Sequence, residues 1–142
     1  MKILRHASAI WNGPVPTGNG TMTLGRNGQT IPFSLKSRTE DGAGTNPEEL
    51  IGAAHAGCFS MSLSSLIEDT GKIPGEVTTT AKVTLEQKAD GFWITEVHLV
   101  TRGSNQSLTN EEFVELAVKA KSTCPVSKLY SSAVITLDAA LT

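Results

Sequence analysis

The chain has 142 residues, of which 39% are hydrophobic and 18% are charged, and its formal net charge is −2. This length fits a single domain over residues 1–142, and the charge balance lacks the basic excess that nucleic acid or an anionic membrane surface would favour. Charged and polar residues at Lys2, Arg5 and His6 interrupt the first apolar segment, which is typical neither of a secretory signal nor of a membrane span, so the expected location is cytoplasmic.

The N-terminal part predicts three short strands. Residues 2–11 hold apolar residues with polar ones between them, and residues 21–24 and 31–35 are β-favouring runs around a turn at Gly25-Arg26-Asn27-Gly28. The third strand is expected to continue toward Arg38.

A dense helix-start signal follows at residues 46–49. Asn46 can cap the exposed amides, Pro47 suits the first helical position, and Glu49 has the capping-box spacing. Residues 50–67 are apolar or small on nearly every face, which predicts a central helix enclosed by other protein. Gly71 is its expected stop.

The C-terminal half predicts a hairpin, a second helix and a last strand. Residues 77–86 alternate strictly between apolar and polar positions, and residues 92–101 are their expected antiparallel partner. Thr109 and Glu112 have the capping-box spacing of an amphipathic helix. Cys124-Pro125 then opens a short helical turn before a strand over residues 133–141.

These elements predict an α+β fold with antiparallel sheets, a long buried central helix and a second helix. A single small sheet could hardly enclose the central helix on all sides. An intertwined homodimer, in which the two long helices pack against each other, would enclose it, and we expect this assembly.

The two cysteines, Cys58 and Cys124, are the candidate reactive groups. In a reducing cytosol such a pair is inert, metal-binding or redox-active. Cys58 has apolar and small neighbours, so a passive core role explains it. Cys124 lies at a helix start, where exposed amides favour a thiolate. Local electrostatics alone therefore favour Cys124 as the nucleophile.

Arg38 and Glu48 are candidates for a charged pair, although a solvated surface cation and a helix-dipole carboxylate are the ordinary explanations. The capping box accounts for Glu49 but leaves Glu48 free to engage a cation such as Arg38. Glu48 and Cys58 lie ten positions apart on the predicted helix, which is about 15 Å along its axis and about 80° around it. They can share a site only if Glu48 comes from the partner subunit.

His55, three residues before Cys58, offers a base for a hydrolase or transferase of the Cys-His type. A histidine satisfied inside the dimer interface is the simpler interpretation. The chain contains no CxxC, HxxxH or HExxH spacing and no phosphate-binding glycine loop, so we expect neither a metal nor a nucleotide cofactor.

Residues 44–61, with the sequence GTNPEELIGAAHAGCFSM, closely resemble the osmotically inducible protein C (OsmC) family, which is related to the organic hydroperoxide resistance proteins. The resemblance extends to Arg38-Thr39-Glu40 and to residues 119–127, KAKSTCPVS, and it covers essentially the whole chain. Gly57 stands where the family most often has alanine, a change expected to loosen the helix slightly without altering the chemistry.

The resemblance implies a homodimeric thiol peroxidase that reduces organic hydroperoxides to alcohols. It implies that Cys58 is the peroxidatic cysteine, that Cys124 is the resolving cysteine, and that Arg38 and Glu48 surround the reacting thiol. This reverses the preference for Cys124 as nucleophile. It further implies regeneration by a dithiol, with a lipoylated protein the favoured reductant, and no prosthetic group or metal.

Two alternatives differ in class from this peroxidase. One is the Cys-His hydrolase or transferase built on Cys58 and His55. The other is a non-catalytic binding module, whose interfacial pocket holds an apolar ligand while both cysteines remain passive.

Overall fold

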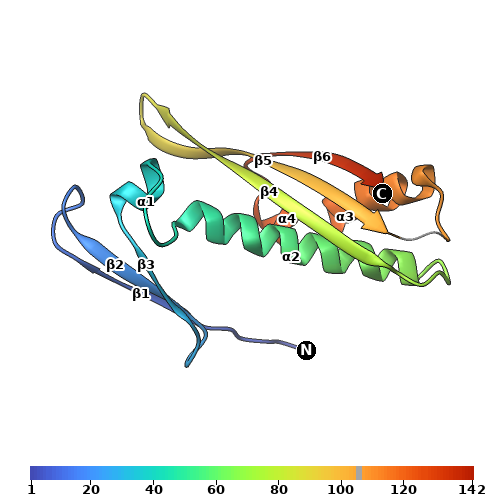
Figure 1. Ribbon diagram of the computed structural model, residues 1–142, viewed down its shortest axis with the longest axis horizontal. Coiled ribbons are helices and arrows are strands. Elements are labelled where there is room, and N and C mark those ends of the chain that lie inside the picture. The colour runs from blue at the N-terminus through green and yellow to red at the C-terminus, as the bar shows by residue number, and fades with distance from the viewer. Residues whose placement is uncertain (105–106) are drawn as a thin grey trace. The chain divides into compact units, whose positions relative to one another are not determined.

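A computed structural model describes residues 1–104 and 107–142, which form two compact units, residues 1–50 and 51–142. The first unit holds β1 (Ala7–Asn12), β2 (Asn19–Leu24), β3 (Thr30–Phe33) and α1 (Leu35–Thr39). Helix α2 (Pro47–Glu68) begins in this unit and continues into the second (Figure 1). The second unit adds β4 (Glu76–Lys88), β5 (Gly91–Ser104), α3 (Asn110–Thr123), α4 (Pro125–Leu129) and β6 (Val134–Leu141). A single domain over residues 1–142 stays a prediction.

The three N-terminal strands form an antiparallel sheet in the order β1-β2-β3, as predicted. The first strand is shorter than expected, because residues 1–6 lie outside it. The predicted extension of the third strand toward Arg38 is wrong. Ser34 and Ser37 form a reciprocal capping box, with N···Oγ distances of 2.9 and 3.2 Å, so the chain turns into α1 instead.

Helix α2 begins at the predicted cap. The side-chain oxygen of Asn46 accepts a hydrogen bond from the Glu49 amide at 2.8 Å, while its side-chain nitrogen donates to the Ser37 carbonyl at 2.7 Å. The Glu49 carboxylate accepts a hydrogen bond from the Thr45 hydroxyl at 2.8 Å. These bonds tie the start of α2 to the short helix α1. At the other end Gly71 adopts a φ of 80°, as expected for a helix stop.

The second sheet is mixed, with the strand order β4-β5-β6. Strands β4 and β5 form the predicted antiparallel hairpin, but β6 lies parallel to β5, so the expectation of purely antiparallel sheets is wrong here. Parallel neighbours require a long crossover connection. Helices α3 and α4 lie in the segment between β5 and β6 and supply it.

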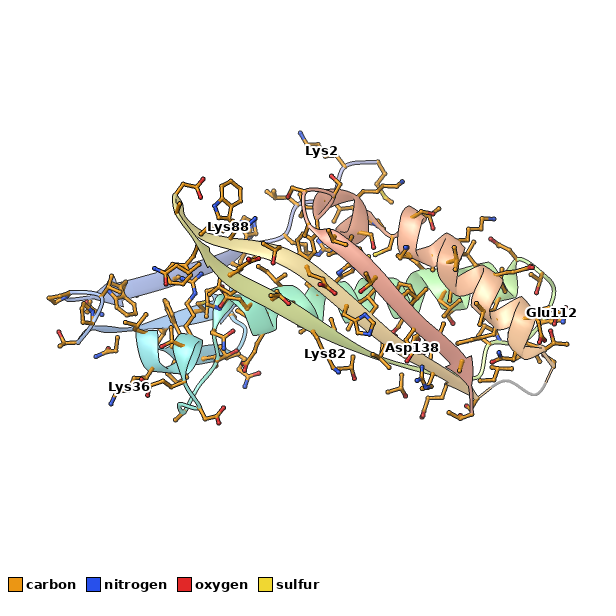
Figure 2. The ribbon with its side chains drawn as sticks, turned by 90° about the horizontal axis from the view of Figure 1, so that it is seen from above. Lys2, Lys36, Lys82, Lys88, Glu112 and Asp138 are labelled. Atoms are coloured by element: carbon orange, nitrogen blue, oxygen red, sulfur yellow. The ribbon has the colours of Figure 1, made fainter. Side chains whose placement is uncertain are left out.

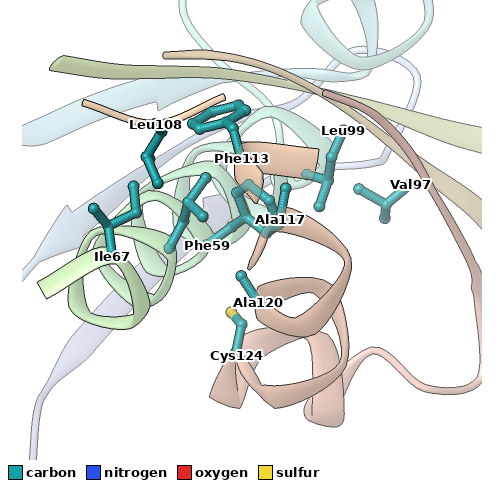
Figure 3. Close-up of a cluster of buried hydrophobic side chains, with 10 residues drawn as sticks. Phe59, Ile67, Val97, Leu99, Leu108, Phe113, Ala117, Ala120 and Cys124 are labelled. Carbon is teal, nitrogen blue, oxygen red and sulfur yellow. The ribbon is translucent and has the colours of Figure 1, made fainter. Parts of the chain in front are cut away.

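One face of this sheet packs against α2 and α3. Residues in register on the three strands, such as Val83, Val97 and Ile135, belong to this face. An added Cβ at Gly103 on β5 would collide with the Phe113 ring, so sheet and α3 approach closely there. Figure 3 shows the buried cluster, formed by Phe59, Leu63, Ile67, Val97, Leu99, Leu108, Phe113, Ala117, Ala120 and Cys124. The other face is polar and includes the exposed Lys82 and Asp138 (Figure 2).

Within the single chain, α2 is buried on one side only. His55, Phe59 and Leu63 are fully buried, whereas Gly57 and Met61 belong to an exposed stripe that also contains Ala53 and Ala54. Only 28% of the most apolar 18-residue window of α2 is buried. The helix is long and apolar enough to cross a membrane, but one such helix is weak evidence, because core helices of soluble proteins meet the same criterion. Its complete enclosure by a second chain stays a prediction.

Candidate active site

The structure brings the two cysteines together. Cys58 lies in the middle of α2, and Cys124 lies at the junction where α3 ends and α4 begins. The two thiols are hydrogen-bonded to each other, with the Sγ atoms of Cys58 and Cys124 2.9 Å apart. Both thiols are free, Cys124 is completely buried beside Ala120 (Figure 3), and Cys58 is partly exposed. This arrangement is a dithiol in which only the Cys58 residue keeps exposed surface.

Within the second unit, the surroundings shift the pKa values of the two thiols in opposite directions. Burial, reinforced by the Cys124 thiol, raises the pKa of Cys58 despite opposing hydrogen bonds from Val126 and Ser62. Burial also acts to raise the pKa of Cys124, but the Cys58 thiol, the Ser127 amide and hydroxyl and the Val126 amide together bring that pKa below its ordinary value. The pair titrates as one system, and none of these groups is a cation.

The first unit contains the other two predicted residues, and they pair within one chain. Arg38 extends from α1, and its Nη2 atom lies 2.7 Å from Oε1 of Glu48 in the first turn of α2. The Arg38 Nε atom bonds both carboxylate oxygens, at 3.1 and 3.2 Å. The Glu48 side chain is 10% exposed and the Arg38 side chain is 41% exposed. The carboxylate is therefore largely buried, whereas the arginine side chain is partly open to solvent.

An apolar pocket of about 210 Å³ lies beside Arg38. Trp11 and Phe33 form one part of its wall, with ring centroids 5.3 Å apart. Arg38 is the charged member of a lining that otherwise consists of Trp11, Val15, Phe33, Ser34, Leu35 and Pro47. Sequence reasoning missed this pocket, because its residues come from two strands, two helices and the loops between them.

His55 pairs with Ser127 of α4 rather than with Cys58, the partner that the Cys-His alternative would require. Its Nε2 atom lies 2.7 Å from the Ser127 hydroxyl oxygen, and its ring meets the edge of Tyr130 at a centroid distance of 5.4 Å. Burial lowers the pKa of His55. The sequence did not lead us to assign Ser127 a chemical role. Its position three residues after Cys124, which is the capping-box spacing, could have drawn attention to it.

Metal ligation has no evident location in residues 1–104 and 107–142, where no group of three or more His, Cys, Asp or Glu side chains could hold an ion. The chemistry of the described residues is therefore that of the two thiols, the Arg38–Glu48 pair and the buried imidazole of His55.

The fold and this site define an α+β protein with an adjacent two-cysteine thiol centre. The chain belongs to the OsmC-like protein family, whose model matches residues 40–138. It is 41% identical over 140 residues to the peroxiredoxin OsmC of Escherichia coli (strain K12), with 97% of this chain and 96% of that protein covered. It is also 32% identical to an organic hydroperoxide resistance protein of Xanthomonas axonopodis pv. citri (strain 306), with 78% and 84% covered.

Solved structures confirm the α+β architecture. An organic hydroperoxide resistance protein from Elizabethkingia anophelis matches with a TM-score of 0.75 and 28% identity over 100% of both chains. The organic hydroperoxide resistance protein OhrB of Bacillus subtilis matches with a TM-score of 0.71 and 25% identity, covering 96% of this chain and 98% of that one.

Proposed function

We propose that this protein is a thiol peroxidase that reduces organic hydroperoxides to alcohols. The observation that carries the proposal is the 2.9 Å contact between the Cys58 and Cys124 sulfurs, in a chain that is 41% identical to a peroxiredoxin. Two thiols in contact can be oxidised to a disulfide without taking the fold apart.

The reaction begins at Cys58. Its thiolate attacks one peroxide oxygen, so that an S–O bond forms, the O–O bond breaks, and the alkoxide takes a proton and leaves as the alcohol. The Cys124 sulfur then attacks the resulting sulfenic acid, forming the Cys58–Cys124 disulfide and releasing water. A dithiol, for which a lipoylated protein is our expected source, restores both thiols by exchange. The site we propose uses no prosthetic group or metal.

Accessibility supports Cys58 as the peroxidatic residue even though local electrostatics favour a thiolate on Cys124. Cys124 is 0% exposed, whereas Cys58 is partly exposed. A bulky hydroperoxide can reach only a sulfur that is open to it, so access decides which thiol reacts first.

Arg38 is the cation that we assign to this reaction. The groups that shift the Cys58 pKa include no positive charge, yet a thiolate nucleophile needs one nearby. A guanidinium carries a permanent charge and a fork of donors, which suits both the thiolate and the developing alkoxide. Glu48 orients this fork through the bonds described above.

We propose that Arg38 and Glu48 act on the Cys58 of a partner subunit. Helix geometry separates Glu48 from Cys58 of its own chain by about 15 Å along α2. The exposed stripe of α2 around Gly57 and Met61 supports an intertwined homodimer, because small and apolar residues suit close helix packing. Because Arg38 and Glu48 are bonded to each other, we expect them to reach the partner's site together.

The apolar pocket beside Arg38 supports an organic substrate. A pocket of about 210 Å³ lined by Trp11, Phe33 and Leu35 can hold the hydrocarbon part of a hydroperoxide while Arg38 faces its oxygens. Hydrogen peroxide would gain nothing from these apolar walls. A cytoplasmic location, with neither nucleic acid nor membrane as partner, stays our expectation.

The decisive experiment is a thiol count with intact mass on the reduced protein after one equivalent of tert-butyl hydroperoxide, with hydrogen peroxide in parallel. We expect rapid loss of both thiols and of about 2 Da with the organic peroxide, and slower loss with hydrogen peroxide. If both thiols persist, the peroxidase proposal fails and the apolar binding module becomes the function to pursue.

A further inference from the structure

The proposed chemistry leaves one buried histidine unused, His55 of helix α2. His55 is one helical turn before Cys58 on α2, its side chain is fully buried, and Ser127, its hydrogen-bond partner, is 4% exposed. The edge contact with Tyr130 holds the imidazole ring in place. The 2.7 Å bond between His55 and Ser127 is therefore closed off from water.

The surroundings of the ring indicate which nitrogen carries the proton. Within residues 1–104 and 107–142, the Nδ1 atom of His55 is buried and has no hydrogen-bond partner. A buried N–H without an acceptor is less tolerable than a buried lone pair without a donor. Burial also lowers the pKa of His55 and so keeps the ring neutral. We therefore place the proton on Nε2, from which it is donated to the Ser127 oxygen.

The Ser127 hydroxyl must then direct its own hydrogen elsewhere, and Cys124 is in the right place. Ser127 is the third residue of α4, whose N-cap is Cys124, so it lies in the same first helical turn as the cap residue. The Cys124 amide is already bonded to the Ala120 carbonyl at 2.9 Å, so it needs no acceptor from Ser127. The Ser127 hydroxyl is among the groups that lower the pKa of Cys124.

We propose that His55 and Ser127 are positioning residues for the resolving step: the imidazole orients the Ser127 hydroxyl, and this hydroxyl donates to the Cys124 sulfur as that sulfur attacks Cys58. The inference rests on the proposed peroxidase function. Once Cys58 is a sulfenic acid, the attack forms the S–S bond and breaks the S–O bond, and the departing hydroxide takes a solvent proton and leaves as water. The Cys124 sulfur is oxidised, the Cys58 sulfur is reduced, and His55 and Ser127 are unchanged.

The elements around Cys124 explain why this donor matters. The titratable groups that face this corner are Cys58 and His55 from α2 and Tyr130, which follows the last residue of α4. Helix α3 and strand β5 contribute apolar side chains there, including Ala117, Ala120, Val97 and Leu99. A thiolate in such apolar surroundings is stabilised by only a few oriented dipoles. Losing one of them should therefore raise the pKa of the thiol.

The first test measures Cys124 alone, in a Cys58→Ser background, by following its thiolate absorbance against pH. Ser127→Ala and His55→Leu should each raise the apparent pKa of Cys124. His55→Gln should restore the wild-type curve, because the amide nitrogen of glutamine replaces the Nε2 donor. The double variant Ser127→Ala/His55→Leu should be no worse than either single variant, since both act through one hydroxyl.

The second test follows a single turnover of the protein with both cysteines, using mass spectrometry of quenched samples. Sulfenic acid should form on Cys58 at the wild-type rate, while Ser127→Ala slows its conversion to the disulfide by about threefold to tenfold near neutral pH. If peroxide oxidises neither thiol of the wild-type protein, the peroxidase proposal fails. The thiolate titration does not depend on peroxide, so it still tests whether Ser127 and His55 lower the pKa of Cys124.

Two results would overturn the inference. One is an unchanged Cys124 titration in Ser127→Ala, which removes a single oxygen atom and so perturbs packing little. The other is a His55→Gln variant that behaves like His55→Leu, because a donor with no effect would leave His55 only a packing role.

Discussion

The sulfurs of Cys58 and Cys124 lie 2.9 Å apart, although the two residues are 66 positions apart in the chain. A disulfide bond is about 2.05 Å long, so closing it requires a shift of less than about 1 Å. Neither α2 nor α4 needs to unfold for this movement. The resolving step that we propose can therefore follow the first oxidation without a large conformational change, which protects Cys58 from further oxidation.

Cys124→Ser removes that protection. The variant should consume one equivalent of peroxide at the wild-type rate and then accumulate sulfinic acid on Cys58 under excess peroxide, because no thiol intercepts the sulfenic acid. Mass spectrometry of the Cys58 peptide measures this product. Cys58→Ser is the matched control and should leave the buried Cys124 unoxidised over the same time. Cys58 that stays unmodified under excess peroxide in Cys124→Ser would contradict the assignment.

Arg38→Ala should slow peroxide consumption by about 10²-fold, the usual effect of losing a preorganised charge donor. Arg38→Lys should recover only part of the rate, because an ammonium keeps the charge but cannot form the paired bonds to Glu48. Lys36→Ala is the control, since Lys36 is an exposed cation two positions earlier on α1. Stopped-flow consumption of tert-butyl hydroperoxide gives all three rates. Equal rates for Arg38→Ala and Lys36→Ala would remove Arg38 from the site.

Heterodimers test whether one site draws residues from two chains. Mixing Glu48→Ala subunits with Cys58→Ser subunits should regain up to about half of the wild-type activity per heterodimer, because one site then carries both defects and the other carries neither. Arg38→Ala in place of Glu48→Ala should behave in the same way, since the two residues are bonded within one chain. Purified heterodimers without activity would show that each chain supplies its own Arg38 and Glu48.

The buried His55 makes stability depend on pH. Its folded-state pKa is lowered from about 6.5, so the unfolded chain binds more protons below that value. Stability should therefore be complete above about pH 6.5 and fall as the pH decreases toward the folded-state pKa. Urea denaturation across this range should give a smaller loss for His55→Gln than for the wild type, because glutamine cannot be protonated there. Parallel curves for the two proteins would contradict a neutral, buried His55.

Local signals in the sequence predicted the elements that depend on local physics. The caps at Asn46 and Thr109 lie where expected, because each needs only its own side chain and amides within three residues. Helix α1 escaped prediction because its cap is a pair of serines, Ser34 and Ser37, without the usual acidic partner. The parallel pairing of β6 escaped as well, since alternation reveals which face of a strand is buried but not its direction.

The sequence by itself determined the family, the two cysteines and the start of α2, because these depend on motifs and on local capping. Only the tertiary structure decided that the thiols meet, that Cys124 is the enclosed one and that Arg38 and Glu48 pair within one chain. It also decided that His55 bonds Ser127, 72 positions away. Such contacts depend on how α2, α4 and the sheet pack together, and their distances in space cannot be derived from spacings along the chain.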